Sequence, residues 1–149
     1  MVRESKKARY LNIAAEVAKG STCLRRAYGC IIVKEDEVIA TGYNGAPRGE
    51  PNCCDVGTCW RAEHNIPHGE QYEKCCAVHA EANAIISAAR RDMIGSTMYL
   101  VGLENGRHID AKPCEICAKL IKNAGIKEVI CSEQEKREID RFGWHGRLW

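Results

Sequence analysis

Residues 77–91 read AVHAEANAIISAARR, a run rich in alanine with apolar residues at helical spacing. This pattern predicts a helix over residues 79–92 that opens near His79. A second helix is predicted over residues 114–124, because the sequence CEICAKLIKNAG starts just after Pro113 and ends in a glycine. Each predicted helix carries candidate metal-binding side chains in its first turn, so the same two segments bear on the fold and on the chemistry.

Four short runs are rich in β-forming residues and predict strands over residues 30–34, 38–42, 98–103 and 127–131. The first two flank the polar residues 35–37 and predict a hairpin. An apolar stripe over residues 6–19 predicts the first helix, and a terminal helix is expected after the last strand. Because helices separate most of the strands, we expect an α/β fold with three α/β/α layers and a mixed, mostly parallel central sheet.

Residues 44–76 are rich in Gly, Pro, Asn and Cys and show little periodicity. Loops longer than about 12–15 residues are usually functional or disordered. The five cysteines of this segment indicate that a metal orders it. We expect one domain over residues 1–149, with residues 44–76 as a Cys-rich insertion.

Net charge favours a small-molecule substrate. The chain carries 22 basic and 20 acidic residues, a formal charge of +2, and the basic residues are scattered. Proteins that bind nucleic acids usually carry a basic face or stripe, so no nucleic-acid partner is expected. No apolar stretch is long enough to span a bilayer and no secretory signal is visible, so we expect no membrane partner and a cytoplasmic location.

Three residues have the chemistry of zinc ligands: His79, Cys114 and Cys117. A structural zinc site is normally closed by four protein ligands, whereas a catalytic site keeps three and leaves the fourth position for water. Glu81 is close to the ligands in the sequence and is free to move the proton of that water. The positive ends of two helix dipoles would also favour the thiolates.

Two plainer interpretations apply to the parts of this motif. Cys114 and Cys117 alone fit a redox pair or another zinc module, and His79 alone fits a buried core histidine. A redox pair does not explain the histidine and the glutamate, however, and a closed structural site has no need of Glu81. The complete pattern therefore favours a hydrolytic metal site.

The pattern H-x-E with P-C-x-x-C is the signature of zinc nucleobase deaminases. The chain is similar to the cytidine and deoxycytidylate deaminase superfamily, and most closely to its dCMP deaminase branch, in blocks at residues 21–23 with Gly29, 41–49, 79–85 and 113–119. The resemblance implies zinc-dependent deamination of dCMP to dUMP and ammonia, in the deoxynucleotide metabolism that supplies dTTP. His79, Cys114 and Cys117 would hold the zinc, and Glu81 would be the proton shuttle.

The resemblance also implies residues that bind substrate. Asn44 would bind the sugar 3′-hydroxyl, although asparagine is also a common turn residue. The backbone N–H of Ala80 would hold the base carbonyl. Arg26 is the first candidate for the phosphate because arginine recognises phosphate bidentately, with Arg25 and Arg48 as alternatives.

A second zinc is expected because some bacterial and phage dCMP deaminases carry one. Its predicted ligands are Cys23, Cys53, Cys59 and Cys75, with His64, His68, Cys54 and Cys76 in reserve. Four thiolates suit a closed structural site. The alternative is a set of free thiols.

Residues 104–112 depart from the family pattern and predict an added turn or hairpin near the pocket. This insertion leaves open a deaminase of another cytosine nucleoside or nucleotide or of guanine, and a catalytically silent zinc-binding regulatory module is a further alternative. The resemblance also implies a homo-oligomer, with a hexamer favoured, and dCTP and dTTP effectors that would bring Mg²⁺. Residues 141–149 carry two tryptophans, and no role is predicted for them.

Overall fold

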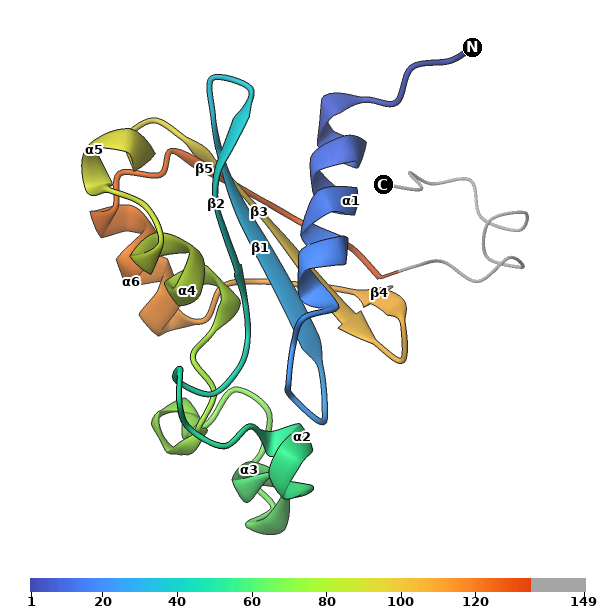
Figure 1. Cartoon of the computed structure of the whole chain (residues 1–149), viewed down its shortest axis with the longest axis vertical. Coiled ribbons are helices and arrows are strands. Elements are labelled where there is room, and N and C mark those ends of the chain that lie inside the picture. The colour runs from blue at the N-terminus through green and yellow to red at the C-terminus, as the bar shows by residue number, and fades with distance from the viewer. Residues whose placement is uncertain (135–149) are drawn as a thin grey trace.

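A computed structural model describes residues 1–134, and in it a five-stranded sheet lies between two layers of helices (Figure 1). The elements in chain order are α1 (Lys6–Ala18), β1 (Ala27–Lys34), β2 (Glu37–Tyr43), α2 (Cys53–Val56), α3 (Trp60–Glu63), the 3-10 helix η1 (Tyr72–Lys74), α4 (Ala80–Ile86), α5 (Arg90–Met93), β3 (Thr97–Glu104), β4 (Arg107–Ile109), α6 (Glu115–Asn123) and β5 (Glu128–Cys131). Helix α1 covers one face of the sheet, and α4, α5 and α6 cover the other (Figure 1). The predicted three-layer α/β/α fold is confirmed.

The sheet is mixed, but the prediction that it is mostly parallel is wrong. Within residues 1–134, β1 pairs antiparallel with β2 and with β3, β3 pairs antiparallel with β4, and only β3 and β5 pair in parallel. The strands joined through helices, β2, β3 and β5, do run in the same direction, as such connections favour. Strand β1 lies between β2 and β3, however, and its opposite direction makes both of those contacts antiparallel.

Alternating side chains of the two central strands supply both hydrophobic cores. Ile31 and Val33 of β1 pack with Tyr10, Ala14 and Ala18 of α1. Their neighbours Cys30 and Ile32 point to the opposite face, where they pack among α4, α5 and α6. Side chains of a strand alternate between the two faces of the sheet. Because helices cover both faces, β1 carries apolar side chains on both of them.

The single helix predicted over residues 79–92 is two short helices, α4 and α5. Ser87 ends α4, and its Oγ donates to the carbonyl oxygen of Asn83 at 2.9 Å. The N–H of Ala88 reaches back three residues, to Ile85, and Ala89 is extended with ψ 141°. A serine side chain that competes for backbone groups in this way favours a helix end.

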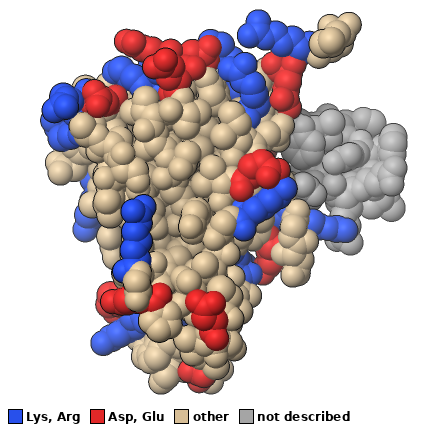
Figure 2. Space-filling model, in the orientation of Figure 1, with Lys and Arg blue, Asp and Glu red and all other residues tan. Residues whose placement is uncertain are grey.

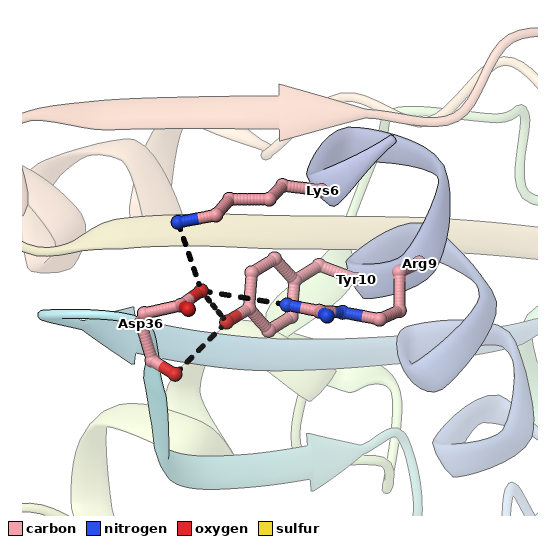
Figure 3. Close-up of polar contacts among 4 residues, drawn as sticks. All are labelled: Lys6, Arg9, Tyr10 and Asp36. Atoms are coloured by element: carbon pink, nitrogen blue, oxygen red, sulfur yellow. Dashed lines mark hydrogen bonds and ion pairs between the residues drawn. The ribbon is translucent and has the colours of Figure 1, made fainter. Parts of the chain in front are cut away.

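The hairpin predicted around residues 35–37 is confirmed, and side chains of α1 hold its turn. Glu35 and Asp36 both adopt positive φ, 51° and 65°. The hydroxyl of Tyr10 donates to the Asp36 carboxylate at 2.5 Å and to its carbonyl oxygen at 3.0 Å. Lys6 and Arg9 each place a cationic nitrogen 3.4 Å from the same carboxylate (Figure 3). This cluster ties the first helix to the turn of the β1–β2 hairpin.

Two glycines let helices approach the sheet closely. A β-carbon at Gly29 would lie 2.1 Å from the carbonyl oxygen of Ala14 in α1, and one at Gly42 would lie 2.3 Å from that of Ala80 in α4. Both distances are far inside van der Waals contact. The second approach fixes α4 at the start of the helix, beside His79.

The other strands and helices predicted from the sequence are present with small shifts of their ends. The insertion at residues 104–112 forms the predicted hairpin, in which β4 pairs with the end of β3. The terminal helix expected after the last strand would extend into residues 135–149, which are outside the described residues. Residues 141–149 belong to the same range. None of the described helices is long and apolar enough to cross a membrane. Figure 2 shows acidic and basic side chains interspersed over one face, without a continuous basic stripe.

Candidate metal-dependent active site

Two helix N-termini form the site. His79 is the N-cap of α4, and Cys114 is the N-cap of α6, where its Sγ accepts from the N–H of Cys117 at 3.5 Å. Glu81 lies in the first turn of α4. The predicted helix starts at His79 and Cys114 are therefore confirmed, and N-terminal helix ends favour nearby thiolates.

The three predicted zinc ligands converge. The Nδ1 of His79 lies 3.5 Å from the Sγ of Cys114 and 3.4 Å from the Sγ of Cys117. All three candidate ligand atoms lie within 4.8 Å of one another. A tetrahedral zinc with bonds of about 2.0 Å to nitrogen and 2.3 Å to sulfur spaces such atoms by about 3.5 Å. The donor set and its spacing fit zinc with one coordination position left over.

Glu81 lies beside the three ligands but does not join them. Its side chain is 5% exposed, and no carboxylate of residues 1–134 belongs to the metal-binding group. Burial raises the pKa of the Glu81 carboxyl, while its own backbone N–H and Cys117 act in the opposite direction. A buried carboxyl with a raised pKa is suited to accept and return a proton near neutral pH.

The thiols respond to the same buried surroundings. Burial, Glu81 and Cys114 raise the pKa of Cys117, and burial with Glu81 raises the pKa of Cys131 to about 11. A bound divalent cation reverses this effect at a coordinating thiol because it stabilises the thiolate. Cys131 lies outside the ligand group.

One cavity is lined by two of the three metal ligands, His79 and Cys114, and by the acid Glu81. His79, Ala80, Glu81 and Cys114 form one part of its wall. The remaining wall is strongly basic and includes Arg25, Arg26, Arg61, His68 and Lys112. The cavity therefore presents metal-binding groups and cationic side chains to one bound molecule.

Residues 4–133 match the family described as the cytidine and deoxycytidylate deaminase zinc-binding region. The chain belongs to this family. It is 38% identical over 121 residues to the deoxycytidylate deaminase of Schizosaccharomyces pombe, a match that covers 81% of this chain and 35% of the yeast protein. It is also 38% identical over 126 residues to the deoxycytidylate deaminase of Mycobacterium phage D29, which covers 81% of this chain and 89% of the phage protein.

A solved structure of similar fold is the dCMP deaminase from the cyanophage S-TIM5 in complex with dCMP and dUMP. It shares 27% sequence identity and a TM-score of 0.62, and the match covers 88% of this chain and 83% of that one. The chain spans less than half the length of two yeast relatives, 35% and 42%, but most of the length of the phage proteins. Zinc is the metal that this deaminase family and the observed donor set share.

Asn44, predicted to bind the sugar, lines the cavity and is itself held by the backbone beside it. Its Oδ1 accepts from the N–H of Tyr28 at 2.8 Å and its Nδ2 donates to the carbonyl oxygen of Arg26 at 3.0 Å. One lone pair and one N–H of the amide are left for a ligand. Ala80 also lines the cavity, at the start of a helix, where backbone N–H groups lack an intrahelical partner.

Arg26, the predicted phosphate ligand, lines the cavity and lies 3.5 Å from Glu104 in an exposed ion pair. Arg25 lines the cavity as well, whereas Arg48 does not. The inserted hairpin borders the same space, because Asp110 and Lys112 belong to the wall. The expectation that this insertion lies near the pocket is confirmed.

The four cysteines predicted for a second metal, Cys23, Cys53, Cys59 and Cys75, do not gather into one site. Within residues 1–134 the His79 cluster alone brings three or more candidate ligands within 4.8 Å of one another. The Sγ of Cys53 instead lies 3.2 Å from that of Cys76. The pKa of Cys53 is raised to about 12 by burial and then by the thiols of Cys76, Cys23 and Cys59. These thiols are therefore near Cys53.

Arg61 and Tyr72 line the cavity but were not predicted from the sequence. Both lie within residues 44–76, which lack the periodicity that predicts buried positions. His68 had appeared only as a reserve metal ligand. Arg61 followed by His68 and Tyr72 matches no recognisable motif. Only the folded structure shows that these three side chains line the cavity.

Proposed function

We propose that the protein catalyses hydrolytic deamination of dCMP to dUMP and ammonia, in pyrimidine deoxynucleotide metabolism. The observation that carries the proposal is the buried Glu81 beside a three-ligand metal cluster, in a cavity whose wall also carries several cationic side chains. The deoxycytidylate deaminases of fission yeast and of phage D29, each 38% identical to this chain, support it. So does the cyanophage dCMP deaminase, whose structure holds dCMP and dUMP.

His79, Cys114 and Cys117 would hold the zinc. When bound, the zinc would lower the pKa of a water molecule so that hydroxide is available near neutral pH. Glu81 would take the proton of the attacking water, deliver a proton to N3 of the pyrimidine as the C4–O bond forms, and return a proton to the amine as the C4–N bond breaks. One water is consumed and one ammonia is released.

The other cavity residues would orient the nucleotide. The backbone N–H of Ala80 would donate to the base carbonyl, and the free capacity of the Asn44 amide would bind the sugar 3′-hydroxyl. Arg26 would bind the phosphate after exchanging its exposed contact with Glu104 for a charge-assisted hydrogen bond. Asn44 also fixes the loop that carries Arg26, so substrate contacts and loop position depend on one side chain.

We also propose a second, structural zinc in the Cys-rich segment. Its support is the proximity of the Cys53 and Cys76 sulfurs, with Cys23, Cys59 and Cys75 along the adjoining cavity wall. Cys76, a reserve ligand in the sequence prediction, would join the site. A thiolate set of this kind would order the segment between β2 and α4.

The remaining expectations are part of the same proposal. The chain would act as one domain with a Cys-rich insertion at residues 44–76, in the cytoplasm, as a homo-oligomer such as a hexamer. dCTP and dTTP would be effectors, with Mg²⁺ bound to the effector nucleotide. Cell fractionation, light scattering and activity measured with each effector test these points separately.

A substrate panel tests the main proposal. Purified, zinc-loaded protein is incubated with dCMP, CMP, deoxycytidine, cytidine and guanine, with and without dCTP, and products are identified by mass spectrometry. Turnover of dCMP above the others supports the proposal. Preferred turnover of another compound in the panel would leave the zinc chemistry in place and change the assigned substrate. No turnover of any compound would support a catalytically silent zinc-binding module.

A further inference from the structure

Arg61 is a buried cation that has no acidic partner within the part of the chain that the structure describes. Its side chain is 7% exposed, and its Nε and Nη2 donate to the carbonyl oxygens of Glu70 at 3.2 Å and Pro67 at 2.7 Å. No carboxylate of residues 1–134 lies within ion-pair distance of Arg61. Burying an unpaired charge is costly, and the two carbonyl contacts leave three of the five guanidinium N–H groups for another acceptor.

The ring of Tyr72 fixes this cation relative to the metal site. The guanidinium carbon of Arg61 lies 4.7 Å from the centroid of the Tyr72 ring. The rings of His79 and His68 each meet Tyr72 edge to face, at centroid distances of 5.2 Å and 6.4 Å. A metal ligand, a buried guanidinium and a second imidazole therefore pack on one aromatic ring in the cavity wall.

The charges around His68 are positive. Burial lowers the pKa of His68, and Arg26, Arg61 and Arg25 lower it further, so all three guanidiniums lie near this imidazole. Of the acidic groups on the wall, Glu81 lies beside the metal ligands, and Asp110 accepts from the N–H of Gln134 at 2.7 Å. The end of the cavity around His68 therefore favours an anion.

We propose that Arg61 and His68 complete, with Arg26, the subsite that binds the phosphate of the nucleotide substrate, and that Tyr72 sets its distance from His79. The inference rests on the proposed deamination of dCMP and deepens it. It makes the 44–76 insertion a source of specificity for nucleotides over nucleosides. Two guanidiniums, of Arg61 and Arg26, and an imidazole N–H match the acceptor oxygens of a phosphate monoester.

Two variants with a matched control test the subsite. Arg61→Gln removes the buried charge, and His68→Asn removes the imidazole at an exposed position where misfolding is not expected. Arg61→Lys keeps a positive charge on a long apolar side chain but removes the guanidinium that lies over Tyr72. Lys74→Gln removes a neighbouring cation that does not line the cavity. Each protein is checked for its thermal unfolding temperature and zinc content.

The readouts are kcat/KM for dCMP relative to deoxycytidine, and calorimetric affinity for dUMP relative to deoxyuridine. Because a hydrogen bond to a charged group is strong, Arg61→Gln and His68→Asn should each lower both ratios about tenfold to a hundredfold. Arg61→Lys should restore part of the loss, and Lys74→Gln should leave the ratios unchanged. Ratios within about twofold of wild type in both variants would overturn the subsite, whereas a wild-type protein that fails to convert dCMP would overturn the proposed function instead.

Discussion

Gly42 and Ala80 approach so closely that a β-carbon on Gly42 would lie 2.3 Å from the Ala80 carbonyl oxygen. Gly42 is in β2, and Ala80 is the first residue of the helix that follows His79 and carries Glu81. Both obstructing atoms near this β-carbon, Ala80 O and the N of Ala84, are backbone atoms. The strand therefore sets the position of the metal ligand and of the acid together.

Gly42→Ala should push α4 away from the sheet. We expect it to lower the free energy of unfolding by about 1–3 kcal/mol, the usual range for an overpacked core, and to lower zinc content because His79 moves. Thermal denaturation and metal analysis measure the two effects. Gly49→Ala is the control, since no atom lies within 4 Å of a β-carbon at Gly49. Its φ of 86° makes alanine costly there, but the change leaves α4 in place, so zinc content should equal that of wild type. Equal zinc content in Gly42→Ala and wild type would contradict the role given to this contact.

The turn at Asp36 should stabilise the protein in a pH-dependent way. A hydrogen bond from Tyr10, and then Lys6 and Arg9, lower the pKa of Asp36 below its ordinary value of 3.8. A group whose pKa is depressed by folding contributes fully above its unfolded pKa and loses that contribution as the pH falls through the folded pKa. Asp36→Asn keeps a residue that tolerates positive φ while removing the charge.

We therefore expect Asp36→Asn to unfold a few degrees below wild type at pH 7 and the difference to shrink as the pH falls below about 3.8. Thermal unfolding followed by circular dichroism between neutral and acid pH measures it. Glu35→Gln, which removes the neighbouring acid of the same turn, is the control and should show no such trend. A wild-type advantage that persists undiminished in acid would count against the carboxylate as its source.

Metal analysis of cysteine variants tests the second zinc. The wild-type protein should hold about two zinc ions per chain, and Cys53→Ser or Cys76→Ser about one, since closed structural sites use all four ligands. Cys54→Ser provides the matched control: Cys54 is adjacent in sequence, and its Sγ lies 4.0 Å from the carboxylate of Asp55. One zinc in the wild type would contradict the second site, whereas two in every variant would remove Cys53 and Cys76 from its ligands.

The local signals of the sequence located both helix starts of the candidate metal site. Helix starts at His79 and Cys114 follow from alanine-rich periodicity, a preceding proline and a terminal glycine, all of which act within a few residues. The break at Ser87 was missed because a side chain that bonds to its own backbone leaves the apolar pattern intact. Helix propensity likewise does not indicate whether one helix or two short helices will form.

Long-range pairing accounts for the larger errors. Nothing in the runs around Cys30 and Leu100 specifies that these residues pair in adjacent strands, although this pairing inserts β1 between β2 and β3 and makes the sheet mainly antiparallel. The contact between Tyr72 and His79 was also not predicted from the sequence. Tyr72 belongs to a segment without periodicity, and its partners are determined by packing rather than by spacing.

The most direct test of the central claim is deamination of dCMP in water enriched with oxygen-18, comparing zinc-loaded wild type with Glu81→Gln. The account predicts dUMP that carries the heavy oxygen at C4 and one ammonia per dUMP from the wild type. Glu81→Gln should keep the zinc of the His79 cluster and lose turnover by about a hundredfold or more, since general acid–base catalysis contributes 10²–10⁴. Absence of dUMP from the wild type, or equal rates in the zinc-loaded variant, would contradict it.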